Sequence, residues 1–238
     1  MISLYGILIS LAILICILLA EKLTSKKDLL WGGAFWGIVS ALLGARIYHV
    51  LSAPPYYLAN PLETLYFWHG GLGIWGAIAG GTIGFALYYK FHHENLWYWL
   101  DLGLVFFPLG QAIGRWGNFF NNEIYGLPTG LPWGIIVNGT RYHPLFLYES
   151  ILDLALFSLL YFLYKTNKGK LLDGFFLFAF LGGYSIIRFW LEFLRIDSWQ
   201  ILGLNVSQTI SILLILVSLI SVKRFIKNDL HCIRPRRV

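Results

Sequence analysis

The residues with the clearest chemical potential lie together in the segment 114–126, which reads Gly-Arg-Trp-Gly-Asn-Phe-Phe-Asn-Asn-Glu-Ile-Tyr-Gly. The segment contains one cation, Arg115, three carboxamides and one carboxylate, Glu123, and it directly follows an apolar stretch. A guanidinium group donates two parallel hydrogen bonds to a phosphate and keeps its charge when it is partly desolvated. The segment therefore predicts polar chemistry on a phosphate group at a lipid surface.

A second polar group lies in a later apolar stretch and consists of Tyr184, Arg188, Glu192 and Arg195. Spacings of four, four and three residues place these side chains on one face of a helix. Ionisable residues in hydrocarbon cost roughly 2.5 kcal/mol or more each and usually mark function. We therefore expect an inward polar stripe in which Arg188 pairs with Glu192. The alternatives are that this pair only fixes the register of the helix and that Arg195 snorkels to the interface.

Histidines and further carboxylates border other apolar stretches. His69 precedes two glycines, and its imidazole can exchange a proton near neutral pH. The alternative is that His69 is not a base and only forms hydrogen bonds with lipid headgroups. Glu149 lies shortly after His143-Pro144, and Pro144 can begin a helix. Asp101 and Asp153 are predicted to lie at membrane edges, where Asp101 caps or anchors its own helix.

The elements that must position these residues are predicted to be membrane-spanning helices. Hydrophobic residues make up 58% of the 238 residues and charged residues only 13%. A hydrocarbon core of about 30 Å requires apolar helices of roughly 17 to 25 residues. Seven such runs are present, at 3–20, 29–51, 70–89, 98–114, 145–164, 174–194 and 204–222. The sequence predicts an all-α polytopic membrane protein with seven transmembrane helices.

The distribution of charge predicts the orientation of these helices. Cytoplasmic loops near helix ends collect lysine and arginine, and all nine lysines follow the first, third, fifth and seventh runs. We therefore expect the N-terminus outside and the C-terminus in the cytoplasm. The net charge of +6 is assigned to topology and to contact with anionic lipid, so no nucleic-acid partner is expected.

The predicted organisation is a single integral-membrane domain over residues 1–222, followed by a basic cytoplasmic tail at 223–238. An outer cap of about residues 115–144, between spans 4 and 5, contains Asn138-Gly139, a dipeptide typical of hairpin turns. The proline-rich segment 53–61 is expected to be a loop along the interface. Cys16 and Cys232 lack the spacing of metal ligands, so we expect no metal site and no cofactor.

Segment 114–126 resembles the signature of the prolipoprotein diacylglyceryl transferases, a family of bacterial integral-membrane enzymes. The signature Gly-Arg-x-Gly-Asn-Phe-x-Asn-x-Glu-x-x-Gly is matched at every fixed position. Departures from the family are the few residues before Tyr5, which are expected to trim the lipid's outer entrance, and Phe146, where many relatives have Gln. Supporting matches follow in family order: Tyr5-Gly6, His69-Gly70-Gly71, Asp101, His143-Pro144, Tyr148-Glu149, Tyr184, Arg188 and Glu192.

The resemblance implies an enzyme of the bacterial plasma (inner) membrane. Its substrates would be phosphatidylglycerol and prolipoprotein signal peptides with a lipobox cysteine. The diacylglyceryl group would move to the cysteine thiol, forming a thioether and releasing glycerol phosphate. In this reaction Arg115 and Arg188 would stabilise the leaving phosphate. His69 would take the proton of the thiol.

The resemblance also implies binding roles for a wider set of residues. Asn118, Asn121 and Glu123 would position the headgroup, and Gly126 would allow a tight backbone turn. The other residues expected to contact substrate are Tyr5, Tyr184, Glu149 and Glu192.

Other classes of protein remain as alternatives at this point. A transporter or channel would also bury arginine and glutamate, but it often has duplicated halves, and the sequence contains no visible repeat. An inactive paralogue that binds lipid or signal peptides is a second alternative. A third is another phosphatidylglycerol-dependent transferase, which identification of the acceptor would separate.

Overall fold

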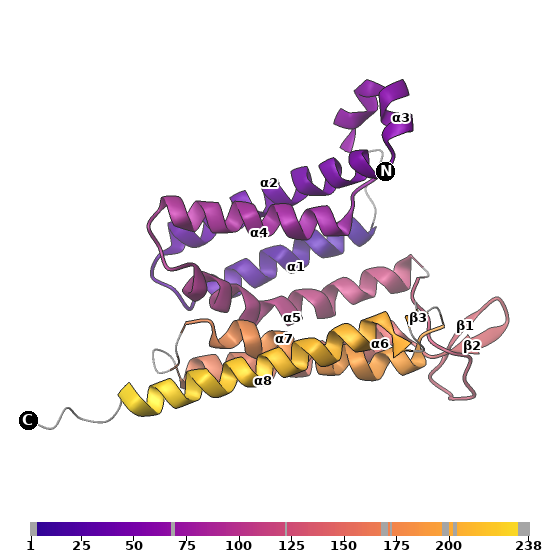
Figure 1. Ribbon diagram of the computed structural model, residues 1–238. Helices are drawn as coiled ribbons and strands as arrows, with labels where there is room; N and C mark the ends of the chain where they lie inside the picture. The colour runs from indigo at the N-terminus through magenta and orange to yellow at the C-terminus, as the bar shows by residue number, and fades with distance from the viewer. Residues whose placement is uncertain are drawn as a thin grey trace, which may run out of the picture. The chain divides into compact units, whose positions relative to one another are not determined.

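The computed structural model describes residues 4–67, 70–121, 123–167, 171, 173–196, 200–201 and 204–232. The described chain is mostly helical (Figure 1). Each long helix coincides with one of the apolar runs, which confirms the all-α prediction. The long helices are α1 (Leu4–Glu21), α2 (Lys27–Ser52), α4 (Ile74–Phe91), α5 (Leu96–Phe120), α6 (Leu145–Thr166), α7 (Phe175–Leu191) and α8 (Val206–Cys232).

Within the described residues, six helical segments are long and apolar enough to cross a membrane. They are α1, α2, α5, α6, α7 extended by the 3-10 turn η3 (Glu192–Leu194), and α8 up to Lys223. Large apolar side chains such as Phe35, Leu159 and Leu213 are exposed on these helices, as expected where lipid surrounds them. The chain is therefore a multi-pass membrane protein. Helix α4 is not among the six, so the seventh span stays a prediction.

The chain divides into two compact units. One unit contains Met1–Ala20 and Leu100–Val238, and the other contains Glu21–Trp99. The first unit holds nearly all of α1 and α5 together with α6, α7 and α8, and the second holds α2, α3 (Pro54–Ala59) and α4. The single domain over residues 1–222 and its boundaries with the cap and the tail remain predictions.

Helices α2 and α4 of the second unit lie side by side and touch through their backbones (Figure 1). A Cβ atom at Gly44 would lie 2.3 Å from the carbonyl oxygen of Gly76, and one at Gly80 would lie 2.3 Å from that of Ser40. Small residues permit this approach between helices in lipid, where apolar burial alone does not drive association. The glycine content of α4 is therefore explained by its packing on α2.

The segment after α2 contains short helices, so the expectation of a loop over 53–61 was wrong. Helix α3 (Pro54–Ala59) and the 3-10 turn η1 (Pro61–Leu65) follow in succession. Pro54 and Pro61 each occupy the first helical position, where the missing N–H has no helical partner to lose. Proline thus begins each turn here.

A two-stranded hairpin lies between α5 and α6. Strands β1 (Ile135–Val137) and β2 (Thr140–Tyr142) pair antiparallel, with Val137 opposite Thr140. Asn138 and Gly139 have positive φ angles of 50° and 81°, as a tight hairpin turn requires. The predicted turn is confirmed, while its position outside the membrane stays a prediction. A shorter pair, β3 (Gln200–Ile201) and β4 (Leu204–Asn205), follows η3.

Candidate functional site

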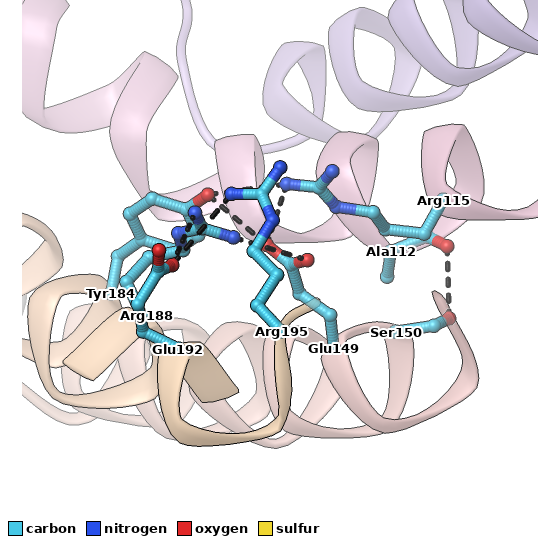
Figure 2. Close-up of polar contacts among 8 residues, drawn as sticks. All are labelled: Ala112, Arg115, Glu149, Ser150, Tyr184, Arg188, Glu192 and Arg195. Carbon is cyan, nitrogen blue, oxygen red and sulfur yellow. Dashed lines mark hydrogen bonds and ion pairs between the residues drawn. The ribbon is translucent and has the colours of Figure 1, made fainter. Parts of the chain in front are cut away.

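Six charged or hydroxyl-bearing side chains converge from α5, α6, α7 and the η3 turn with the residue that follows it (Figure 2). The sequence placed them in separate stretches, and the fold brings them together within the first unit. We call this group the arginine cluster. Its members are Arg115, Glu149, Tyr184, Arg188, Glu192 and Arg195.

Glu149 is the centre of the arginine cluster because it contacts both α5 and α7. Its Oε1 atom lies 2.5 Å from Nη2 of Arg115, and its Oε2 atom lies 3.8 Å from Nη1 of Arg188. The Tyr184 hydroxyl donates to Oε1 of Glu149 at 3.1 Å and accepts from Nη2 of Arg115 at 3.2 Å. One carboxylate therefore orients two guanidinium groups that come from different helices.

Glu192 is the second carboxylate of the cluster. Its Oε2 atom lies 3.2 Å from Nη2 of Arg188 and 3.7 Å from Nη1 of Arg195. The predicted pairing of Arg188 with Glu192 is confirmed. Arg195 also faces Glu192, and the alternative that Arg195 snorkels to the interface stays open.

Burial separates the acids of the cluster from its cations. The Glu149 and Glu192 side chains are each 2% exposed, whereas those of Arg115 and Arg188 are 21% and 20% exposed. A guanidinium group carries more N–H donors than these pairs use, and it does not lose its proton. The three arginines of the cluster outnumber its two glutamates. The cluster is therefore suited to bind an anion, such as a phosphodiester.

Ser150 fixes α6 against α5 beside the cluster. Its hydroxyl donates to the carbonyl oxygen of Ala112 at 2.9 Å, and the bond is buried (Figure 2). Ser150 follows Glu149 directly, and Ala112 lies one helical turn before Arg115. This bond positions the two partners of the shortest ion pair in the cluster. Ser150 was not predicted, because a lone hydroxyl in an apolar helix was its only signal in the sequence.

Asp153 was predicted to lie at a membrane edge, and its depth in the membrane stays a prediction. It follows Glu149 by one turn of α6 and is fully buried. Neither of its carboxylate oxygens has a hydrogen-bond partner within the described part of the chain. The fold packs Asp153 inside the unit because its face of α6 points inward along with Glu149.

Asp101 caps a different helix from the one expected. The side chain of Asp101, on α5, accepts hydrogen bonds from the backbone N–H groups of Gly174 and Leu177 at the start of α7. The prediction that Asp101 caps its own helix was therefore wrong, whereas the two bonds do anchor that helix to the start of α7. A search along the sequence for caps considers only nearby residues, and this partner is 73 positions away.

The rest of the signature segment lies where α5 ends. Asn118 is buried, whereas Asn121 and Glu123 are exposed. The Glu123 N–H donates to the Asn118 carbonyl oxygen at 2.9 Å and closes the last turn. Among the described residues, no hydrogen bond or ion pair joins these three side chains to the arginine cluster. Their binding roles remain predictions.

Two glycines of the signature are required by close packing. A Cβ atom at Gly117 would lie 2.2 Å from the ring of Tyr5, which places Tyr5 directly against α5. A Cβ atom at Gly126 would lie 2.8 Å from Cβ of His143 and from the carbonyl oxygen of Leu194. Gly126 was expected to allow a tight turn, but the positive φ angle in this segment belongs to Ile124. The reason for glycine at position 126 is therefore its contact with the end of η3.

His69, the predicted base, lies outside the described residues. Arg46 of the second unit hydrogen-bonds to backbone carbonyls on both sides of this position in the chain. It donates to Thr64 at 3.1 Å, to Gly70 at 2.6 Å and also to Glu63. Arg46 is 4% exposed, so this cation holds the backbone and is not available to a substrate.

The candidate ligands for a metal ion are dispersed. No group of three or more histidine, cysteine, aspartate or glutamate side chains in the described ranges is arranged to hold a metal. The acids of the arginine cluster are already paired with cations. The donor set of the site is therefore suited to an anion.

Comparison with known proteins gives similarity over most of the chain. The family described as prolipoprotein diacylglyceryl transferase matches residues 1–223. The phosphatidylglycerol--prolipoprotein diacylglyceryl transferase of Fervidobacterium nodosum is 41% identical over 233 residues, which cover 90% of this chain and 77% of that protein. The protein of the same name from Synechocystis sp. is 39% identical over 230 residues, covering 90% and 81%. That from Finegoldia magna is 38% identical over 233 residues, covering 94% and 93%.

Proposed function

The chain belongs to the prolipoprotein diacylglyceryl transferase family, and we propose that it transfers a diacylglyceryl group from phosphatidylglycerol to the lipobox cysteine of prolipoproteins. The products are a thioether-linked lipid on the protein and glycerol phosphate. This reaction is the first step of lipoprotein maturation. The observation that carries the proposal is the convergence of Arg115 and Arg188 on Glu149 in an apolar helical bundle.

The arginine cluster receives the phosphate of the lipid headgroup. Its three arginines outnumber its two glutamates, which favours the negative charge of a phosphodiester. The partly exposed guanidinium groups of Arg115 and Arg188 supply the free donors, and the buried glutamates hold them in place. Preorganised donors of this kind stabilise charge that develops in a water-poor site.

The transfer step moves charge onto this phosphate. The cysteine thiolate attacks the glyceryl carbon that is bound to the phosphate oxygen, and a C–S bond forms as the C–O bond breaks. The electron pair of the broken bond stays on the leaving oxygen, so the phosphate gains one negative charge. Arg115 and Arg188 stabilise that charge. The thiol proton passes to a base, for which His69 is the candidate because an imidazole titrates near neutral pH.

The remaining residues predicted from the signature bind and orient the substrates. Tyr184 supports this role because its hydroxyl already lies between Arg115 and Glu149. Tyr5 packs on Gly117, two residues after Arg115, and can present its hydroxyl near the headgroup. Other residues assigned to headgroup binding are Asn118, Asn121, Glu123, Gly126 and Glu192.

The transfer takes place in the bacterial plasma (inner) membrane, in a protein with seven spans. Helix α4 supplies the additional span, supported by its close packing along α2. The N-terminus then lies outside and the C-terminus in the cytoplasm, as the lysine distribution indicates. The hairpin of β1 and β2 belongs to a small cap on the outer side.

An in vitro transfer assay tests the proposal. The purified protein in nanodiscs is given phosphatidylglycerol and a peptide with a lipobox cysteine. A diacylglyceryl mass shift on the peptide and released glycerol phosphate are expected, and both should be lost with a Cys→Ser peptide or with Arg115→Ala. Folded protein that binds the lipid but gives no product would overturn the proposal in favour of an inactive paralogue. Product on another acceptor would indicate a different transferase.

A further inference from the structure

We infer that Asp101 is a positioning residue that sets the register of α5 against α7, and so the depth at which Arg115 and Arg188 meet. The effect on catalysis rests on the proposed function. The contact itself lies near the opposite end of both helices from the arginine cluster.

The Asp101 carboxylate acts as the N-cap of α7 from a neighbouring helix. The first N–H groups of a helix have no partner within it, and a capping side chain bonds to the third residue. Gly174 occupies the cap position and has no side chain to do this. Instead Oδ1 of Asp101 accepts from the N–H of Leu177 at 2.9 Å, and Oδ2 accepts from that of Gly174 at 2.7 Å. The negative charge also lies at the positive end of the α7 dipole.

Two further contacts show that α5 and α7 run parallel from this point. The rings of Phe107 and Phe180 are 5.3 Å apart, at the same separation along the chain as Asp101 and Gly174. Near the ends of the helices, Arg115 contacts Tyr184. Ring contacts tolerate sliding, whereas two directional hydrogen bonds to a carboxylate do not. The bonds to Asp101 are therefore the contacts that define the register.

The two arginines lie equally far along the sequence from this contact. Arg115 is 14 residues after Asp101, and Arg188 is 14 residues after Gly174. At a rise of 1.5 Å per residue, both lie about 21 Å along their helices. Pro108 lies within this stretch of α5, so the two distances are similar and not identical. Glu149 contacts both arginines at this level. A slip of α7 by one residue would move Arg188 about 1.5 Å and rotate it by about 100°.

A kinetic double-mutant cycle tests the inference on the full-length protein. Asp101→Asn keeps the size of the side chain but replaces one acceptor with a donor that faces an N–H group. It should lower kcat about 100-fold, the loss that a misplacement of 1 Å can cause, with little change in KM for phosphatidylglycerol. In an Arg188→Lys background, Asp101→Asn should lower kcat much less, because the guanidinium group that Asp101 positions is already absent. An equal loss in both backgrounds would overturn the inference.

The conservative variant separates register from simple capping. Asp101→Glu retains the charge and both acceptors but is longer by one methylene group. It should restore slow amide exchange at residues 174–177 while kcat stays low. Recovery of both would mean that Asp101 only caps α7. Asp28→Asn, an exposed acid in the first turn of α2, is the matched control and should change neither quantity.

Amide exchange also distinguishes failure of this inference from failure of the proposed function. If the unaltered protein makes no product, the proposed function fails. Faster exchange at Gly174 and Leu177 in Asp101→Asn would still support the contact that sets the register. Unchanged exchange at these amides would refute it, whatever the activity.

Discussion

At the scale of single residues, Glu149 allows two arginine side chains to bind one phosphate. The guanidinium groups of Arg115 and Arg188 repel each other, and the carboxylate between them offsets that repulsion. Because Glu149 is buried, the attraction is little screened by water or salt. Its Tyr184 partner fixes the same oxygen that Arg115 contacts. The geometry of the arginines therefore depends on an acid that need not touch the substrate.

Glu149→Gln should lower kcat of diacylglyceryl transfer by about 10- to 100-fold, because both arginines lose the group that orients them. The amide is nearly the same size as the carboxylate, so the packing of α6 is retained. The measurement is the rate of thioether formation at saturating phosphatidylglycerol. Glu94→Gln, which alters a carboxylate in the other unit, is the control and should leave the rate unchanged. A Glu149→Gln protein with a normal rate would contradict the role of Glu149 in orienting the arginines.

At the scale of elements, the contact between α2 and α4 depends on the absence of side chains. Gly44→Ala would place a Cβ atom 2.3 Å from the carbonyl oxygen of Gly76 and 2.9 Å from Cα of Gly80. Since backbone cannot rotate away, we expect a loss of about 1–3 kcal/mol in unfolding free energy. Thermal unfolding in detergent measures it.

Gly103→Ala is the matched control for this prediction. Gly103 also lies inside a helix, but among the described residues no atom outside its own helix lies within 4 Å of an added Cβ. Alanine is favoured over glycine in helices by about 1 kcal/mol, so Tm should rise or stay the same. A similar fall in Tm for both variants would show that close packing is not the cause.

An ion pair in the second unit makes its stability depend on pH. Lys26 donates to Glu94 at 2.6 Å, from the turn before α2 to the turn before α5. This hydrogen bond lowers the pKa of Glu94 below its ordinary value. A carboxyl group with a lowered pKa in the folded chain stabilises the fold at pH values above its pKa in the unfolded chain, about 4.3. This stabilisation is lost as the pH falls through the pKa of the folded chain. The pair should therefore contribute at neutral pH and not in acid.

Comparison of Tm for the unaltered protein and Glu94→Gln tests this pH dependence. At neutral pH the variant should unfold at a lower temperature. At about pH 3, where the carboxyl group is largely protonated in the unfolded chain, the difference should shrink. An equal difference at both pH values would mean that the charge of Glu94 is not involved.

At the scale of the whole molecule, the number of spans decides which segments share a side of the membrane. If α4 crosses, Lys26 and Thr140 lie on opposite sides. If it does not, they lie on the same side, because the direction of α5 is reversed. The lysine distribution and the packing of α4 on α2 both favour seven spans.

Labelling of single cysteines in intact cells tests the topology. With Cys16 and Cys232 replaced by serine, Thr140→Cys should react with a maleimide that cannot cross the membrane. Lys26→Cys should react only after the cells are permeabilised. Labelling of both sites in intact cells, or of neither, would contradict seven spans, and the reverse pattern would contradict the predicted orientation.

Features that depend on near neighbours along the chain could be predicted before the fold was known. Apolar runs located the long helices because the length of a run reflects the thickness of the bilayer. Asn138 and Gly139 indicated the hairpin because few residues adopt its positive φ angles. The pairing of Arg188 with Glu192 followed from helical geometry, since side chains four residues apart lie on one face.

Contacts between residues far apart in the sequence became visible only in the folded chain. Glu149 connects Arg115 to Arg188, Asp101 caps α7, and Gly126 packs against the end of η3. No sequence period encodes these contacts. The physical reason is that an apolar helix face is as stable against lipid as against another helix. Hydrophobicity therefore does not determine which helices pack together. Close backbone packing and directional polar bonds make that choice, and both depend on the folded arrangement of the helices.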